Sequence, residues 1–247
     1  MIARVVGVIP ARLDSKRFYG KVIYSFRGHP LLYYLYSEFS KSKVIDKLII
    51  ATDSKKVQAT AEEFGAEVVM TSKYLKCGTE RVAEVASKVR GDIYLNIQAD
   101  VFGLKYSSLD NALEKFKRDS PAEFGTLARK IEHDAELVNP DSVKVVLKED
   151  KDAGWFSRYP IPYLRHSLEK PRVKQFDYYY HIGVYMFKRA ALKQFAKWQP
   201  TPNEKTESLE QLRILENGKN IKVYLTKAKT VSVDSPRDIK KLKEVFN

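Results

Sequence analysis

The chain has 247 residues, 44% of them hydrophobic, and a mean hydropathy of −0.40, which is the composition of a soluble globular protein able to bury a full core. No apolar run approaches the ~20 residues needed to cross a bilayer, and the short N-terminal apolar run leads into a cationic loop rather than forming a signal peptide. Cys77 is the only cysteine, which excludes an intrachain disulfide and is consistent with a cytoplasmic protein.

The formal net charge of +13 makes nucleic acid the obvious partner to consider. Lysine dominates, however, and the cations are spread along the chain without a basic tail or an aromatic-plus-basic RNA motif. We therefore expect a solvated basic surface and phosphate-bearing substrates rather than nucleic acid. A non-catalytic nucleic-acid or nucleotide-binding protein remains the alternative from another class.

Strand-like and helix-like patterns alternate through the first half of the chain. Short apolar runs predict buried strands at 5–9, 47–51, 67–70 and 92–97. Helical patterns lie between them, at 30–40, 55–64 and 78–89. Ser54 is an N-cap signal for the second helix, and Gly65 ends it. This alternation predicts a parallel sheet with right-handed crossovers.

The pattern changes in the second half. Strands are expected at 125–130, 143–148, 179–188, 221–227 and 231–234, and helices at 109–118, 190–197 and 207–216. The third of these helices rests on the core-like spacing of Leu209, Leu212 and Leu215. Residues 165–175 are polar and basic and predict a mobile loop, and Ser235-Pro236 starts a last helix.

A cationic loop follows the first strand and predicts a polyphosphate site. In an open α/β sheet, ligands bind outside the carboxyl ends of the strands. Arg12 and Arg17 present forked guanidinium groups to phosphate oxygens, and Lys16 and Lys21 act as point charges. A solvated basic loop is the structural alternative.

Two acids stand at strand ends far apart in sequence. Asp100 and Asp234 would both face the carboxyl edge of the predicted sheet, beside the cationic loop. Hydrated Mg²⁺ takes few protein ligands and leaves positions for phosphate oxygens, so this pair suits Mg²⁺. Alternatively, Asp234 caps the last helix and Asp100 is an ordinary loop acid.

The segment Cys77-Gly78-Thr79-Glu80-Arg81 joins a strand to a helix. Gly78 lets the backbone approach a ligand, Thr79 is a candidate helix cap, and the helix N-terminus offers backbone donors. The alternative is an ordinary capped helix start. Cys77 lacks an identified base partner, so we interpret it as a pocket-lining or core residue rather than a nucleophile. Together, the loop cations and the acids suggest nucleotidyl transfer, which depends mainly on positioning and charge neutralisation.

Nine segments carry a resemblance to one enzyme family over essentially the whole chain. They are IPARLDSKRFYGK, IIATDS, VMTSKYLKCGTERVAEV, LNIQAD, NPDSVKVV, WFSRYPIP, HIGVYMFKR, KWQPTPNEKTESLEQLRIL and VSVDSPRDI. On these segments the chain resembles the CMP-Kdo synthetase (3-deoxy-manno-octulosonate cytidylyltransferase) family. The resemblance implies an α/β, Rossmann-like (GT-A-like) nucleotidyltransferase: three α/β/α layers, a mostly parallel mixed sheet and a smaller dimerisation subdomain. We expect a single domain over 1–247, with about 150–190 contributing to a sugar pocket and a homodimer interface.

The implied activity is CTP-dependent transfer of CMP to a 2-keto-3-deoxy sugar acid, a step of lipopolysaccharide biosynthesis. The resemblance assigns contacts with the nucleotide to Ala11, Arg12, Ser15, Arg17, Lys21, Cys77, Gly78, Thr79 and Arg81. It assigns Mg²⁺ to Asp100 and Asp234, which with Arg12 and Lys21 form the catalytic set. It assigns the sugar-acid pocket to Gln98, Arg158, His181, Tyr185, Glu210 and Gln211. From the local pattern alone, His181 would be a packed core residue and Glu210-Gln211 a helix surface facing solvent or a pocket.

The chain departs from the family pattern at three places. Tyr19 replaces a proline in the phosphate loop, which removes a fixed φ angle. Ala99 replaces a glycine beside Asp100, which would clash if φ must be positive. Leu75-Lys76 replaces His-Gln before Cys77. Three outcomes therefore stay open: an ordinary family member, a paralogue for a related sugar acid or another nucleotide, and a weakly active nucleotide-binding homologue. Retention of Asp100 and Asp234 favours an active enzyme.

Overall fold

The computed structural model describes residues 3–15, 17–166 and 171–246. Lys16 of the predicted phosphate loop lies outside the described residues, as do 167–170 of the predicted mobile loop. Part of that predicted loop has regular structure, since Arg172–Lys174 forms the 3₁₀ turn η2.

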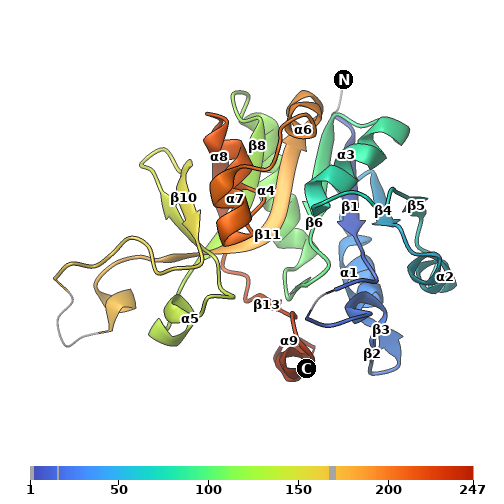
Figure 1. The fold of residues 1–247 in the computed structure, drawn as a ribbon, viewed down its shortest axis with the longest axis horizontal. Helices are drawn as coiled ribbons and strands as arrows, with labels where there is room; N and C mark the ends of the chain where they lie inside the picture. Colours follow the sequence, from blue (N-terminus) through green and yellow to red (C-terminus); the bar gives the residue numbers. More distant parts are fainter. Residues whose placement is uncertain (1–2, 16, 167–170, 247) are drawn as a thin grey trace.

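A nine-stranded mixed sheet forms the centre of the fold (Figure 1). Its strands are β1 (Val5–Pro10), β4 (Lys47–Thr52), β5 (Val68–Met70), β6 (Ile93–Ile97), β8 (Phe124–Lys130), β9 (Lys144–Leu147), β10 (Ala153–Ser157), β11 (Tyr179–Lys188) and β12 (Ile221–Leu225). The main path runs β10-β9-β11-β6-β1-β4-β5, and β8 lies between β11 and β12. Strands β6, β1, β4 and β5 pair in parallel, as predicted, and β11 is antiparallel to its neighbours β6, β8 and β9.

Helices connect these strands. The α-helices are α1 (Leu31–Phe39), α2 (Lys55–Glu63), α3 (Gly78–Lys88), α4 (Tyr106–Arg118), α5 (Asp134–Val138), α6 (Arg189–Phe195), α7 (Pro202–Glu207), α8 (Leu212–Glu216) and α9 (Leu242–Val245). Two further 3₁₀ helices are η1 (Lys21–Ile23) and η3 (Pro236–Lys241). Two short antiparallel pairs complete the structure: β2 (Ser25–Phe26) with β3 (His29–Pro30), and β7 (Val101–Phe102) with β13 (Val231–Ser232).

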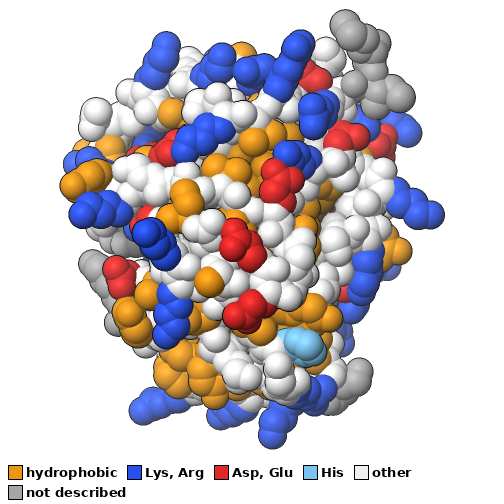
Figure 2. Space-filling model, turned by 90° about the vertical axis from the view of Figure 1, so that its right-hand side faces the viewer, with side chains coloured by type: hydrophobic (Ala, Val, Ile, Leu, Met, Phe, Trp, Pro, Cys, Tyr) orange, Lys and Arg blue, Asp and Glu red, His pale blue; other side chains and the backbone are white. Residues whose placement is uncertain are grey.

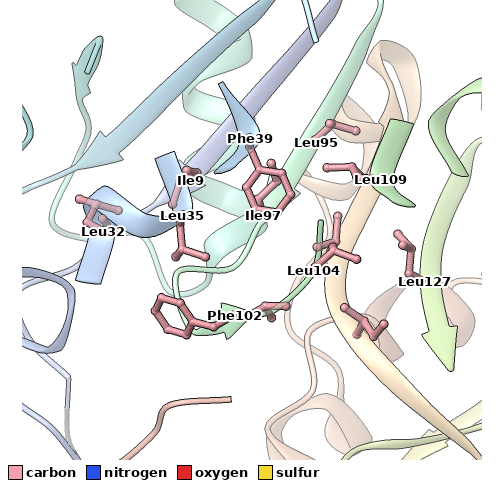
Figure 3. Packing of buried hydrophobic residues seen from close by; sticks show 14 of the residues in the cluster. Ile9, Leu32, Leu35, Phe39, Leu95, Ile97, Phe102, Leu104, Leu109 and Leu127 are labelled. Atoms are coloured by element: carbon pink, nitrogen blue, oxygen red, sulfur yellow. The ribbon is translucent and has the colours of Figure 1, made fainter. Parts of the chain in front are cut away.

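Each face of the sheet carries its own hydrophobic core. Successive side chains of a strand point to opposite faces, so Val5 and Ile9 of β1 join one cluster while Val6 and Val8 join the other. Helices α1, α2 and α4 cover the first cluster, and α3, α6 and α8 cover the second. Figure 3 shows part of the first, to which α1 contributes Phe39 and β6 contributes Ile97. The predicted three-layer α/β/α architecture is confirmed.

The local signals of the first half are confirmed. The Ser54 hydroxyl accepts a hydrogen bond from the backbone nitrogen of Val57 (3.4 Å) and caps α2. Gly65 follows α2 with a φ of +78°, the left-handed conformation expected of a helix-ending glycine. The predicted strands and helices of this half match β1, α1, β4, α2, β5, α3 and β6 to within two residues at each end.

Two local predictions are wrong. The helix expected at 207–216 is interrupted: α7 ends at Glu207, Ser208 has a φ of +53°, and α8 starts only at Leu212. The leucine spacing reflects burial of a turn as well as of a helix. Thr79 is not the cap of α3, because Cys77 is the N-cap residue and has no side-chain capping bond. The strands expected at 221–227 and 231–234 are present as β12 and β13, each ending two residues earlier.

None of the helices in the described ranges is long and apolar enough to span a membrane. On the face that Figure 2 shows, Lys and Arg side chains are scattered among acidic and uncharged ones rather than gathered in one stripe. This distribution agrees with the dispersed charge expected from the sequence.

Candidate active site

The pairing of β7 with β13 brings Asp100 and Asp234 together. Ser232 lies opposite Val101, and the backbone nitrogen of Val233 donates to the carbonyl oxygen of Asp100 (3.2 Å). The Lys21 Nζ atom lies 3.2 Å from Asp100 Oδ2 and 3.8 Å from Asp234 Oδ1. Both carboxylates therefore lie within 4 Å of one ammonium group of the cationic loop.

Two adjoining cavities open at this edge of the sheet, of about 550 Å³ and 270 Å³. The larger is named cavity A and the smaller cavity B. Their shared wall consists of Lys76, Cys77, Gly78, Gln98 and Asp100. Strands β1 and β6 and the N-terminus of α3 meet at this wall. A Cβ atom on Gly78 would lie 3.3 Å from Pro10 Cγ and 3.2 Å from Asn96 Nδ2, so glycine permits the close approach of α3 to both strands.

Most of the predicted nucleotide residues gather around cavity B. They are Arg12, Ser15, Lys21, Cys77, Gly78 and Arg81. Ala11 and Thr79, which were also predicted to contact the nucleotide, are buried and are not among its lining residues. The Ala11 backbone nitrogen bonds to the carbonyl oxygen of Ala51 (2.8 Å), and the Thr79 hydroxyl accepts from Asn96 Nδ2 (3.0 Å).

The two arginines that line cavity B form hydrogen bonds or ion pairs with other groups of the protein. The Arg12 guanidinium donates to the carbonyl oxygen of Leu75. Arg81 is fully buried, pairs with Asp53 (3.0 Å) and donates to the Thr71 hydroxyl. Burial lowers the pKa of Arg81, and its Nε atom is buried without a hydrogen-bond partner among the described residues. The Asp53 carboxylate compensates the buried charge of Arg81.

Arg17 lies elsewhere than the sequence led us to expect. It lines cavity A and forms ion pairs with Asp141 and Asp234, each at 2.8 Å. The substitutions beside the loop cause no backbone strain. Tyr19 is largely exposed, and the non-glycine residues with positive φ in the described ranges are Arg27, Lys151 and Ser208, so the concern about Ala99 does not apply.

All six residues predicted for the sugar-acid pocket line cavity A. They are Gln98, Arg158, His181, Tyr185, Glu210 and Gln211. Arg158 is oriented by two backbone carbonyls, since its Nε donates to Glu207 (2.7 Å) and its Nη1 to Pro140 (3.0 Å). This fixed guanidinium is suited to bind a carboxylate.

His181 is a neutral hydrogen-bonding group. The Thr126 hydroxyl donates to the carbonyl oxygen of Val184 (2.8 Å), so it accepts from Nε2 of His181 (2.9 Å). Burial lowers the pKa of His181 to about 3. The imidazole therefore carries its proton on Nε2 and no charge at neutral pH.

Glu210 lines cavity A and accepts hydrogen bonds from residues at and beside the wall that the two cavities share. Its Oε2 accepts from the backbone nitrogen of Thr79 (3.0 Å), and its Oε1 accepts from Asn96 Nδ2 (3.1 Å) and Gln98 Nε2 (3.4 Å). The neighbouring Gln211 is buried rather than on a solvent-facing helix surface. Its Oε1 accepts from the Tyr185 hydroxyl (3.0 Å), while its Nε2 is buried without a partner among the described residues. That donor remains available to a ligand in cavity A.

Cys77 lies in the wall that cavities A and B share, in agreement with its interpretation as a pocket-lining residue. Burial raises its pKa, and the nearby Glu210 carboxylate raises it further. The sulfur is therefore protonated at neutral pH and unsuited to nucleophilic attack.

Sequence reasoning missed several residues of cavity A, among them Lys76, Asp141, Tyr180 and Lys205. It also missed Lys144, which is fully buried and donates from Nζ to the carbonyl oxygens of Asn139 (3.0 Å), Ser142 (2.5 Å) and Arg158. Burial lowers the pKa of Lys144 to about 8. The available signal was a lysine inside the apolar run of N-P-D-S-V-K-V-V.

Comparisons with known proteins agree with this geometry. The family profile described as Cytidylyltransferase matches residues 6–221. The 3-deoxy-manno-octulosonate cytidylyltransferase of Chlorobaculum parvum is 39% identical over 245 residues, which cover 98% of this chain and 97% of that protein. The protein of the same name from Geotalea uraniireducens is 36% identical over 246 residues, with 98% of each chain covered.

Solved structures give the same result. A structure of CMP:2-keto-3-deoxy-manno-octonic acid synthetase complexed with CTP has a TM-score of 0.89 at 32% identity and covers 99% of this chain and 98% of that one. The inositol-1-phosphate CTP transferase of T. maritima shares only the fold, with a TM-score of 0.69 at 16% identity, covering 98% of this chain and 95% of that one.

Proposed function

The chain belongs to the cytidylyltransferase family, and on that premise we propose that it transfers CMP from CTP to Kdo (3-deoxy-manno-octulosonate) or a close relative, releasing pyrophosphate. One observation carries the proposal. Most of the residues expected to bind nucleotide line cavity B, all those expected to bind sugar acid line cavity A, and Asp100 lies in the wall that the two cavities share. An acceptor in cavity A would thus face the phosphates of a nucleotide in cavity B.

Magnesium fits the carboxylate pair at this junction. No group of three or more His, Cys, Asp or Glu side chains in the described ranges is arranged to hold a metal ion. Mg²⁺ is commonly bound through one or two carboxylates together with substrate phosphates, and Asp100 and Asp234 supply two. Bound there, Mg²⁺ would neutralise charge on the phosphate oxygens during transfer.

The side chains of the protein account for positioning of both substrates. Arg12, Lys21 and Arg81 bind the phosphates in cavity B, and Arg158 binds the carboxylate of the sugar acid in cavity A. The anomeric hydroxyl then attacks the α-phosphorus of CTP. The new O–P bond forms as the bond to the bridging oxygen breaks, pyrophosphate leaves, and the hydroxyl proton passes to solvent. Fixed geometry and charge neutralisation supply the rate enhancement.

The proposal is tested by pyrophosphate release from CTP with Kdo as acceptor, in the presence and absence of Mg²⁺. Release that requires both acceptor and metal is the expected result. A screen of other 2-keto-3-deoxy acids and of all four nucleoside triphosphates distinguishes a paralogue. No release at high enzyme concentration with any acceptor of this class contradicts the proposal.

We further propose that the chain is one nucleotidyltransferase domain that works as a cytoplasmic homodimer. Among the residues that the structure describes, four of the eight large hydrophobic side chains with high exposure lie between residues 138 and 176: Val138, Tyr159, Tyr163 and Phe176. This segment contains β10 and η2, which lie on the left of Figure 1, away from β1, β4 and β5. An exposed apolar surface of this kind favours association with a second copy.

A further inference from the structure

A third cavity, of about 520 Å³, shares no lining residue with cavities A and B. It lies at the carboxyl ends of β8 and β12, which form a parallel pair with Leu225 opposite Ala128. Lys130 ends β8, and Lys227 follows β12. The edge where parallel strands end is the usual place for ligands in open α/β sheets, and this pair repeats the arrangement of β1 and β6 at the candidate active site.

Three lysines from three separate elements converge on this cavity, and its lining contains no carboxylate. They are Lys115 of α4, Lys130 of β8 and Lys227 after β12. Lys130 pairs with the exposed Asp177 (2.5 Å), which lies outside the lining. Lys115 and Lys227 form no ion pair with any residue that the structure describes. Like charges facing one cavity repel one another, and a bound anion would relieve that repulsion.

Helix α4 adds neutral hydrogen-bond donors to the lysine ammonium groups of this cavity. Ser108, Asn111 and Lys115 are spaced by three and four residues, so they form one stripe along the helix that faces the cavity. The opposite stripe of α4, including Leu109 and Phe116, is buried in the core. Hydroxyl, amide and ammonium groups thus approach the cavity from one wall.

The remaining wall is apolar and aromatic. Tyr224 is largely buried, packs edge-on against Phe116, and holds its hydroxyl 3.4 Å from an oxygen of Asp119. Leu225 and Tyr179 stand beside it in the lining. A ligand of this cavity would therefore have both cations and an apolar, aromatic surface within reach.

We propose that this lysine cavity binds a small phosphorylated molecule, with its phosphate oxygens on Lys115, Lys130 and Lys227 and an organic part against Tyr224 and Leu225. Cations that converge on a concavity of this volume suit a compact anion, whereas a polynucleotide surface needs a stripe that follows the backbone. The site is separate from the proposed reaction and does not depend on it.

Equilibrium dialysis tests the site, because it counts the molecules bound per chain. The probes are CMP and inorganic tripolyphosphate, each without acceptor. The cavity variant is Lys115→Gln/Lys227→Gln, and the matched control is Lys55→Gln/Lys56→Gln, two exposed lysines of α2. A second variant, Arg12→Ala/Lys21→Ala, removes binding at cavity B. We expect at least one probe to bind twice per wild-type chain, with one equivalent at least tenfold weaker in the cavity variant and unchanged in the control.

The outcomes separate the two possible ligand sources and the two sites. Loss of CMP binding in the cavity variant identifies a nucleotide site, and loss of tripolyphosphate alone identifies a polyphosphate site; either supports the proposal. If both probes bind once, and only the Arg12→Ala/Lys21→Ala variant loses them, the proposal is overturned. Binding of polyuridylate that depends on the same lysines, with neither small probe bound, also overturns it. Cavity-dependent binding in a protein that lacks cytidylyl transfer would refute the proposed function while leaving this site intact.

Discussion

The ammonium group of Lys21 lies close to the carboxylates of both Asp100 and Asp234. Its Nζ atom also donates to the carbonyl oxygen of Val233 (2.7 Å), so three oxygen-bearing groups fix the ammonium. Two carboxylates this close repel each other, and the lysine charge offsets that repulsion when no metal is bound. The same side chain therefore holds the two acids close together, as the proposed Mg²⁺ site requires.

Replacing Asp100 with Asn should abolish Mg²⁺-dependent turnover while leaving the protein folded. The amide keeps the shape but removes a charge that would bind the metal, and we expect kcat to fall by about 100-fold or more. Lys21 keeps Asp234 and Val233 as partners, so the melting temperature should change little. Pyrophosphate release and thermal unfolding measure the two effects. The exposed Asp150→Asn serves as control, and an active Asp100→Asn enzyme would exclude Asp100 as a metal ligand.

The lowered pKa of His181 predicts that the free energy of unfolding decreases at acid pH. Its folded-state pKa of about 3 lies below the ordinary 6.5, so the unfolded chain binds a proton that the folded chain excludes between these values. The free energy of unfolding should therefore decrease by about 1.4 kcal/mol for each pH unit below 6.5, and this contribution should be absent above 6.5. Urea unfolding from pH 7 to pH 5 measures the slope.

His181→Gln keeps a donor for Thr126 but cannot take up a proton, so its unfolding free energy should depend less on pH than that of the wild type. His133→Gln, at an exposed position, controls for the loss of a histidine. Equal slopes for the wild type and His181→Gln would show that His181 does not cause the acid loss.

The segments that carry cavities A and B depend on close backbone approaches. Gly103, between β7 and α4, has a φ of +86°, and a Cβ atom there would overlap the carbonyl oxygen of Lys229 just before β13. This glycine therefore lets the segments bearing Asp100 and Asp234 pack together. Gly28 has nearly the same φ, +87°, but nothing within 4 Å of its would-be Cβ.

The two glycines make a matched pair of alanine substitutions. Gly28→Ala should cost about 1–2 kcal/mol, from the left-handed backbone alone. Gly103→Ala should cost a further 1–3 kcal/mol or so, from the clash with Lys229, and should also reduce kcat by displacing Asp234. Chemical unfolding and steady-state kinetics measure both quantities. Equal effects on stability and kcat would show that the β7–β13 packing does not position the acids.

The break between α7 and α8 shows why the helix at 207–216 could not be predicted. Arg213 is buried and binds Glu204 through Nε (2.8 Å) and Nη2 (2.5 Å), and its Nη1 pairs with Glu80 of α3 (3.1 Å). These contacts fold α8 back against α7 and turn Glu210 and Gln211 toward the cavities. The spacing of the leucines indicates which residues are buried. It cannot indicate this long-range ion-pair network, because the network forms only in the tertiary structure.

Arg213→Met should destabilise the fold strongly, because it leaves the Glu204 carboxylate buried without its partner. The expected loss is about 3–5 kcal/mol. The double variant Glu204→Gln/Arg213→Met should recover part of it, since residue 204 then carries no charge. Unfolding in urea for the two single variants and the double variant gives the coupling between the residues. Additive losses would show that the pair acts as two independent side chains.

The sequence predicted the parallel strands of the first half and named several of the residues that line cavities A and B, for different physical reasons. Parallel strands and their helices follow from local periodicity, as in β1, α2 and β6. The set around cavity A followed from resemblance, because Arg158 and Gln211 have no local pattern that marks a pocket. Neither the local pattern nor the resemblance singled out Tyr180 and Lys144. Tyr180 lines cavity A and Lys144 bonds to backbone carbonyl oxygens, and both settings exist only in the complete fold.

The segment from 138 to 176 makes the strongest prediction about assembly. A homodimer that buries Tyr159 and Tyr163 should sediment as a single species of twice the chain mass at micromolar concentration. Tyr163→Glu places a charge in the expected interface, and burying an unpaired charge is costly, so this variant should sediment as a monomer. Tyr74→Glu, at a residue equally exposed but outside the segment, is the matched control and should remain dimeric. A monomeric wild type would refute the dimer. A dimer that only Tyr74→Glu disrupts would move the interface to the opposite flank of the active-site edge, beside α3.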